Sequence, residues 1–330
     1  MAEFILGNSL SGAARKYPFI QRVLWRIDFA LVWSLIKVFS LLPPDTASRF
    51  GSLLGRVVGP RLRRKTEMFR ENLSIAFPEK SAAELEQLIL QSWRSAGRVL
   101  AEYPHFNNIY ESRDRQRLHI ELLDPTLTFG EDCPPVVVVG AHHCNWEMVA
   151  SAMGKLDIPN VSLYTPPTNP LLDQMLSESR KKLNCELIPR DNAARVLIRA
   201  LKAGRSAGLV MDRRVDDGIP VPFFGRDKPS TLLPAKLALK FGIELIPARV
   251  ERLRDAEFKV SFYPPVHPTD PNAGETEQAA DMIRQVHALF EDWIQAEPQD
   301  WFCPKRMWPK NATDNADTSA DDSEVKSYAA

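Results

Sequence analysis

Two histidines and a glutamate stand directly after an unusually apolar run. The stretch PPVVVVGAHHCNWEM places His142, His143 and Glu147 just beyond four consecutive valines at 136–139. A continuous apolar run of this kind is typical of a strand that is covered on both faces. In open α/β sheets, functional side chains gather beyond the carboxyl ends of the strands. The position therefore favours chemistry by an imidazole that a rigid strand holds at a fixed point.

The spacing of these residues restricts which of them can pair. His143 and Glu147 are four residues apart, which on a helix places them on one face. His142 is about 140° from Glu147 around an ideal helix, so these two meet only if His142 lies in the turn and Glu147 in the first helical turn. Asn145 is a good N-cap candidate and would put Glu147 at the second helical position. Such a pair could act as a general base on a hydroxyl; the alternative is a hydrogen-bonded structural histidine.

Other chemistries have less support. Cys144 beside a histidine is a minor alternative as a nucleophile. Adjacent residues rarely chelate one metal ion, and the four cysteines form no C-x-x-C pair, so we expect no metal site. A G-x-S-x-G match occurs as GRSAG at 204–208, but it stands at the start of the apolar run SAGLVM and not at the strand-to-helix turn of a serine hydrolase. The chain has no G-x-G-x-x-G or Walker motif, which argues against nucleotide binding. Lys and Arg total 42, as do Asp and Glu, so the net charge does not indicate a nucleic-acid partner and we expect none. We also expect no cofactor.

The rest of the chain predicts an α/β fold in which helices flank a largely parallel central sheet. From about residue 134, short apolar runs alternate with helical segments, which is the signature of such a sheet. Before it, Pro78 should end one helix and a Ser81–Glu84 capping box should open the next. We expect one α/β domain over 61–310 and a disordered acidic tail over 311–330.

The N-terminal residues 1–60 predict membrane-associated helices. Residues 24–42 are the most apolar segment, and Arg26 and Lys37 fall on one narrow polar stripe of it. Such a helix either lies in the membrane interface or spans the bilayer; the alternative is a buried helix of the main domain. The basic run RLRRK at 61–65 suits an anionic leaflet. Glycines at 51, 55 and 59 permit close helix contact.

Several stretches together resemble one family. AHHCNWE fits the H-x-x-x-x-[DE] motif of the lysophospholipid acyltransferase superfamily. Its N-W-E ending resembles the late acyltransferases of lipid A biosynthesis, the lauroyl/myristoyl transferases of Gram-negative bacteria. Further stretches resemble that family in the same order, from about residue 20 to 310: RENLSIAFPE, YTPPTNPLLDQML, ELIPRDNAARVLIRALKAG, GLVMDRRVDDGIPVPFFGRDKPS and EPQDWFCPKRMWP. His143 and Cys144 depart from it, because small or apolar residues are common there.

The resemblance implies a function and roles for residues. His142 would be the base and Glu147 its orienting partner, with Cys144 a bystander. An acyl chain would pass from acyl carrier protein or acyl-CoA to a hydroxyl of a Kdo-bearing lipid A precursor, in lipopolysaccharide biosynthesis at the cytoplasmic face of the inner membrane. A transferase for another lipid acceptor (lysophospholipid, mannolipid or aminolipid) and a non-catalytic lipid-binding protein of the same fold stay open as alternatives.

Residues that follow other predicted strands or turns are candidates for substrate binding. These are Arg190, Asp212, Arg213, Phe223, Phe224 and Gly225. The charged ones fall at the same strand-end rim as His142, where arginines suit phosphate groups; surface ion pairing is the alternative. The Phe-Phe-Gly group could wall the acyl groove, or could be core aromatics at a turn.

Overall fold

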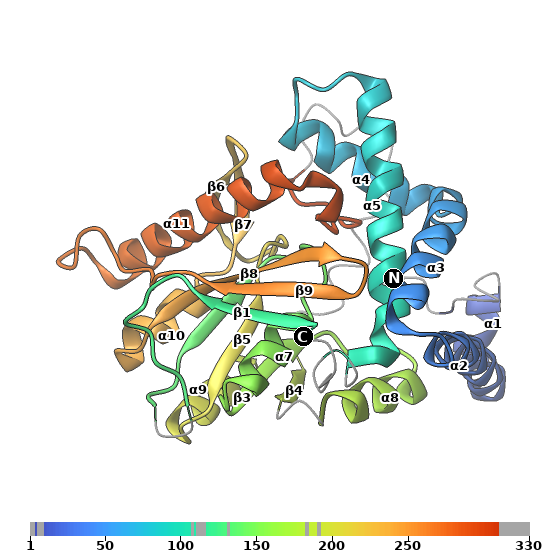
Figure 1. Ribbon diagram of the computed structural model, residues 1–330, viewed down its shortest axis with the longest axis horizontal. Helices are drawn as coiled ribbons and strands as arrows, with labels where there is room; N and C mark the ends of the chain where they lie inside the picture. Colours follow the sequence, from blue (N-terminus) through green and yellow to red (C-terminus); the bar gives the residue numbers. More distant parts are fainter. Residues whose placement is uncertain are drawn as a thin grey trace.

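The valine run forms strand β2 (Val137–Gly140), which is fully buried at the centre of a seven-stranded sheet. The computed structural model describes residues 4, 10–106, 109, 117–130, 133–181, 185–189 and 193–309. The sheet order is β1-β9-β8-β2-β5-β3-β4 (Figure 1). The other strands are β1 (Leu118–Leu122), β3 (Asn160–Tyr164), β4 (Cys185–Pro189), β5 (Ser206–Val210), β8 (Leu245–Arg254) and β9 (Glu257–Phe262).

The helices fill the intervals between the strands and precede them at the N-terminus. They are α1 (Ser11–Lys16), α2 (Pro18–Ser40), α3 (Pro44–Val58), α4 (Arg63–Ala76), α5 (Ala82–Glu102), α7 (Met148–Lys155), α8 (Pro170–Lys181), α9 (Ala193–Lys202), α10 (Leu233–Phe241) and α11 (Glu275–Ala296). Short 3-10 turns are η2 (Gly59–Arg61), η3 (Tyr103–His105) and η4 (Pro298–Asp300). The predicted capping box of Ser81 and Glu84 is present at the start of α5.

The largely parallel sheet is confirmed, with one antiparallel pairing. Strands β8, β2, β5, β3 and β4 pair in parallel. Strand β9 turns back on β8 and pairs antiparallel with it, and β1 adds to β9 in parallel. Two features were not predicted from the sequence: β1, and the separate hairpin of β6 (Ile219–Phe223) and β7 (Arg226–Ser230). The prolines and charged residues of that hairpin hide the usual strand pattern.

Both faces of the sheet are covered. The side chains of Val137 and Val139 pack into the larger apolar cluster, to which α9, α10 and α11 contribute. Val136 and Val138 point to the other face and pack with Met148 and other residues of α7. Alternate residues of a strand face opposite sides, so helices on both faces account for the unbroken valine run.

The N-terminal helices are joined to the rest of the molecule by very close packing of α3 on α5. A Cβ atom added at Gly51 would lie 2.3 Å from the carbonyl oxygen of Gly97, and one at Gly55 would lie 2.0 Å from that of Trp93. Only glycine permits the two backbones to approach so closely. The expected contact through glycines is confirmed, whereas the domain boundary at residue 60 stays a prediction.

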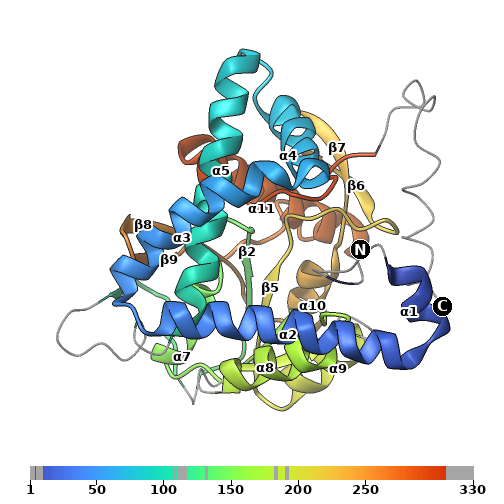
Figure 2. The ribbon, with the colours of Figure 1, turned by 90° about the vertical axis from the view of Figure 1, so that its right-hand side faces the viewer.

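Helices α2 and α3 lie on one side of the molecule, with α5 behind α3 (Figure 2). Each of these two helices carries exposed apolar side chains at helical spacing. In α2 the exposed stripe is Phe19, Val23, Ile27 and Leu31, and in α3 it is Phe50, Leu53 and Val57. Within the described residues, no helix combines the length and the apolarity that crossing a bilayer requires. The predicted tail at 311–330 lies outside the described residues.

Candidate active site

The parallel pairing of β2 with β5 brings His142 to Asp212. Gly140 pairs with Val210 at the carboxyl ends of the two strands, and each strand is followed two residues later by a site residue. The Nδ1 atom of His142 lies 2.5 Å from Oδ1 of Asp212. The imidazole keeps a 12% exposed edge, whereas the Asp212 side chain is completely buried. The pair therefore combines a fixed, enclosed carboxylate with a ring that a substrate can still reach.

Two further groups hold Asp212 in place. The indole Nε1–H of Trp301 donates to Oδ2 of Asp212 over 3.0 Å, and Trp301 has no exposed surface. The ammonium group of Lys228, also fully buried, donates to the backbone carbonyl of Asp212. Its Nζ lies 4.3 Å from the ring centroid of Phe223. With both oxygens engaged, the Asp212 carboxylate can rotate neither away from His142 nor toward a substrate.

The electrostatics favour a neutral imidazole beside an ionised carboxylate. Burial raises the pKa of Asp212, but the charge of His142 and its hydrogen bond, with Lys228 and Arg213, hold that pKa well below its usual value. Burial lowers the pKa of His142; Asp212 opposes this, and the charges of Arg213 and Lys305 add to it. An ionised carboxylate only accepts hydrogen bonds, so Nδ1 carries the hydrogen. Nε2 then has a free lone pair, as a general base requires.

The turn that carries His142 is anchored to the segment at 297–302. The backbone carbonyl of His142 accepts from the N–H of Phe302 at 2.8 Å, and the N–H of Cys144 donates to the carbonyl of Asp300 at 2.8 Å. His143 Nε2 donates to the carbonyl of Glu297 at 3.0 Å. His143 is 2% exposed, so the structural role that was open for a histidine here belongs to His143.

Glu147 lies immediately before α7, which begins at Met148. Asn145 does not cap this helix, contrary to expectation. Cys144 adopts a left-handed backbone with a φ of 53°, and the Asn145 carboxamide is used elsewhere, because its Nδ2–H donates to Glu102. Helical backbone therefore starts later, with Glu147 at the N-cap. The assignment of Glu147 as the orienting partner of His142 stays a prediction, while the carboxylate bonded to Nδ1 is that of Asp212.

Cys144 lacks the properties of a nucleophile. It is 1% exposed, and burial raises the pKa of its thiol far above the usual value. The thiolate is the nucleophilic form of cysteine, so an acyl-cysteine intermediate at this position has no physical support.

The remaining predicted residues differ in their surroundings. Arg213 is half-buried and close enough to His142 for its charge to lower the pKa of the imidazole. Phe223 is fully enclosed and stacks with Trp308 at 5.9 Å between ring centroids. Phe224 and Gly225 form the turn of the β6–β7 hairpin with φ values of 50° and 67°. A groove wall at these three positions stays a prediction, and Arg190 lies outside the described residues.

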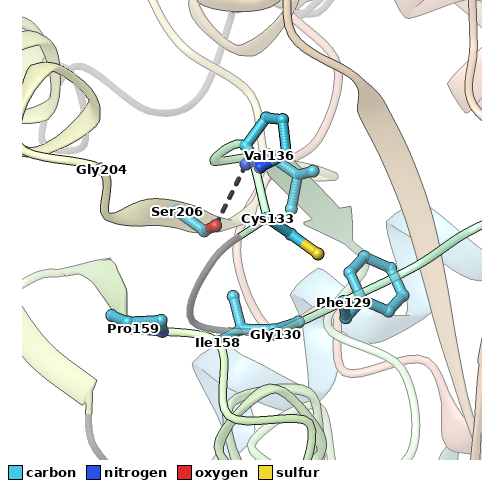
Figure 3. Close-up of a pocket in the computed structure, with 9 residues that line it drawn as sticks. Phe129, Gly130, Cys133, Val136, Ile158, Pro159, Gly204 and Ser206 are labelled. Carbon is cyan, nitrogen blue, oxygen red and sulfur yellow. Dashed lines mark hydrogen bonds between the residues drawn. The ribbon is translucent and has the colours of Figure 1, made fainter.

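A small pocket at the amino ends of the central strands takes no part in this site. It is lined by Phe129, Cys133 and Ile158 with the segments that precede β2 and β5. Figure 3 shows the Ser206 hydroxyl accepting from the N–H of Val136, at 3.0 Å, in its wall. Val136 precedes β2, whereas His142 follows it, so the pocket and the imidazole lie at opposite ends of the strand.

Trp301 and Lys228 are site residues that the sequence analysis missed. Trp301 stands in the stretch EPQDWFCPKRMWP, whose signal in the sequence is its resemblance to the family and not a strand-end position. A lysine is almost never fully buried without a partner, but its burial is not visible in the sequence. The sequence indicates that His142 and Asp212 each follow a strand. Their hydrogen bond could not be predicted, because the sequence does not show that β2 and β5 are neighbours.

The protonation states predict the pH dependence of the reaction. Because the pKa of His142 lies below its usual value, we expect kcat/KM to be flat near neutrality and to fall in acid with an apparent pKa under about 6.5. Lys305→Met removes a positive charge that disfavours the imidazolium, so the acid limb should move to higher pH. Initial rates across the pH range test both points; an unmoved acid limb in Lys305→Met would contradict this account.

The model of a family described as bacterial lipid A biosynthesis acyltransferase matches residues 19–310. The chain belongs to this family. The match begins at the second residue of α2 and includes every strand of the sheet, so the paired His142 and Asp212 lie within the family's shared region.

Individual relatives of this family member cover different parts of it. A lipid A biosynthesis palmitoleoyltransferase of Escherichia coli is 31% identical over 186 residues, which are 56% of this chain and 60% of the relative. A lipid A biosynthesis lauroyltransferase of the same organism is 22% identical over 86% of the chain and 88% of the relative. A phosphatidylinositol mannoside acyltransferase of Mycobacterium tuberculosis is 28% identical over 80% of the chain and 81% of the relative. The first match thus spans about three fifths of the relative's length.

Proposed function

We propose that this protein transfers a fatty acyl chain from a thioester donor to a hydroxyl group of a lipid A precursor. The observation that carries the proposal is the His142–Asp212 pair, in which Nδ1 is bonded to a buried carboxylate and the imidazole keeps 12% of its surface exposed. Membership of the family supports acyl transfer as the reaction. Acyl carrier protein or acyl-CoA would be the donor, and a Kdo-bearing lipid A precursor the acceptor.

The residues account for each proton in the reaction. Nε2 of His142 takes the proton of the acceptor hydroxyl as its oxygen attacks the thioester carbonyl. The Asp212 carboxylate stabilises the imidazolium that forms, and Trp301 keeps that carboxylate in place. Collapse of the tetrahedral intermediate breaks the carbon–sulfur bond, and the imidazolium returns its proton to the departing thiolate. The products are an ester and a free thiol, with no acyl-enzyme.

The charge around the imidazole suits a phosphorylated substrate. Arg213 and Lys305 both act on His142 through their positive charge, and Lys305 is exposed. A lipid A precursor and the phosphopantetheine arm of a donor both carry phosphate, for which Arg and Lys are the usual partners. We therefore assign Arg213 and Lys305 to the binding of a substrate phosphate, in addition to their effect on the imidazole.

A defined transfer assay tests the function. The full chain is incubated with acyl carrier protein or acyl-CoA thioesters of several chain lengths and with a Kdo-bearing lipid A precursor. We expect the mass of the precursor to increase by one acyl chain. A mannosylated phosphatidylinositol and a lysophospholipid are run in parallel, because the mannoside acyltransferase resembles the chain over four fifths of its length. Transfer only to one of these would replace the lipid A precursor as acceptor, and transfer to none would sink the proposal.

The apolar stripes of α2 and α3 fit docking to the surface of a lipid bilayer, where the acceptor resides. The four stripe residues of α2 recur every four positions and those of α3 every three or four, so each helix presents one apolar edge to the outside. Basic residues follow directly at 61–65. Apolar side chains with adjacent cations are what an anionic membrane interface binds, and we propose that these helices lie flat on the cytoplasmic leaflet of the inner membrane.

Phe50→Ser combined with Leu53→Ser should weaken membrane binding. Each side chain is more than half exposed, so its loss removes apolar contact with lipid rather than core packing. Because a buried apolar side chain contributes about 1.5–3 kcal/mol, we expect the affinity for anionic vesicles to fall by about tenfold or more. Cosedimentation with phosphatidylglycerol-containing vesicles measures it. Leu123→Ser, an exposed leucine outside these helices, is the control; equal binding by all three proteins would refute the docking face.

A further inference from the structure

A completely buried carboxylate at the end of α5 connects three segments of the molecule. Glu102 has no exposed surface. One of its oxygens accepts from the hydroxyl of Ser48 on α3 at 2.6 Å, and the other from the carboxamide of Asn145 at 2.9 Å. The guanidinium of Arg252 on β8 binds both oxygens. A buried charge is costly unless it is paired and fully hydrogen-bonded, and Glu102 meets that condition only while all three segments stay in place.

Its contact with Asn145 acts on the turn between β2 and α7. That turn passes through Cys144 in a left-handed conformation, which costs about 1–3 kcal/mol for a residue other than glycine. The N–H of Cys144 donates to the carbonyl of Asp300, and the side chain of the next residue, Asn145, donates to Glu102. The Ser95 hydroxyl of α5 also binds the Asp300 side chain. Helix α5 therefore supports the turn directly through Glu102 and indirectly through Asp300.

We propose that Glu102 is a positioning residue for His142 and acts through the side chain of Asn145. Neither residue has exposed surface, so neither touches a substrate. Without this contact the strained turn relaxes, and the imidazole loses its alignment with the acceptor hydroxyl, although the Asp212 hydrogen bond can persist. Misplacement of a catalytic group by about 1 Å can cost about a hundredfold in rate. The kinetic part of this inference rests on the proposed acyl transfer.

A reciprocal exchange of the two side chains tests the contact. Glu102→Gln leaves one acceptor oxygen, for which Asn145 and Arg252 compete, and Asn145→Asp places two carboxylates against each other. The double variant Glu102→Gln/Asn145→Asp restores one carboxylate and one amide donor with their positions exchanged. We expect each single variant to lower kcat by about ten- to a hundredfold with KM within about threefold. The double variant should recover at least about tenfold over Asn145→Asp.

Glu86→Gln is the matched control. Glu86 is also an α5 carboxylate bonded to an arginine, Arg70 at 2.6 Å, but it is exposed and far from the turn in the helix sequence. Its kcat should equal that of the wild type. If a single variant does not fold, Asn145→Ala takes its place, because it leaves the Glu102–Arg252 ion pair intact.

Hydrogen–deuterium exchange over residues 141–149 reads the turn without any assay of activity. Exchange should be faster in both single variants than in the wild type and in Glu86→Gln, and slower again in the double variant. Unchanged exchange and kcat in the single variants, or a double variant no better than Asn145→Asp, would overturn the inference. Wild-type protein that transfers no acyl chain would instead refute the proposed function, and the exchange rates would still decide the role of Glu102.

Discussion

His142→Gln should lower kcat for acyl transfer by about 10²–10⁴-fold while the protein stays folded. Glutamine fills similar space and can keep a polar contact with Asp212, but it has no group that takes a proton near neutral pH. General-base catalysis contributes about this factor, and the effect should appear in kcat because the imidazole acts on the hydroxyl as it attacks. Single-turnover transfer, followed by mass spectrometry, measures it.

The control is a histidine of a different kind. The His267 side chain is 66% exposed, and its Nε2 atom lies 3.4 Å from Oε2 of Glu244. His267→Gln should retain wild-type turnover. Thermal unfolding of both variants separates loss of chemistry from loss of fold, and wild-type turnover in a folded His142→Gln protein would refute the mechanism.

Asp212→Asn should cost at least about 10³-fold in kcat, more than the loss of one charge would predict. Trp301 can only donate a hydrogen bond, so it selects the carboxamide oxygen of the new asparagine. The carboxamide nitrogen then faces His142 and donates to Nδ1. The imidazole must shift its hydrogen to Nε2, which removes the lone pair that takes the substrate proton. A forced wrong tautomer is known to cost about 10⁴-fold in the serine protease triad.

A second substitution can release that tautomer. In Asp212→Asn/Trp301→Phe the indole donor is absent, so the carboxamide can turn its oxygen to His142 and restore the useful tautomer. We expect the double variant to be more active than Asp212→Asn, even though Trp301→Phe alone loses a buried contact. Glu147→Gln should also lower kcat, by about tenfold or more, but without rescue by Trp301→Phe. Equal effects of Trp301→Phe on both backgrounds would contradict the proposed pairing of Asp212.

The parts of the site that follow from local pattern were predictable from the sequence. Four valines before a glycine and two histidines indicated a central strand with functional residues at its end, and β2 has that form. Asp212 was likewise placed at a strand end. Local pattern does not state which strands are neighbours, however, and Glu147 was the nearest carboxylate along the chain. The register Gly140–Val210 supplies the missing information.

Other parts depend on contacts between distant residues. Trp301 reaches Asp212 across 89 positions of sequence, and no periodicity encodes that contact. The β6–β7 hairpin was not predicted because prolines at 220, 222 and 229 usually argue against strands. Asn145 is a preferred capping residue by type, but its burial against Glu102 gives its carboxamide another partner. In each case tertiary packing overrides local preference.

The anchoring of the turn at 142–144 by the segment at 297–302 has a consequence for how the enzyme matures. His143 and Glu297 are 154 positions apart. Because closing so long a loop has a large entropic cost, we expect this contact to form slowly and late in folding. Strands and helices can form while this end of the chain is still undocked, but the imidazole then lacks its anchors. Competence to react should therefore be acquired in the last stage of folding, after the apolar N-terminal helices have already had the opportunity to meet lipid.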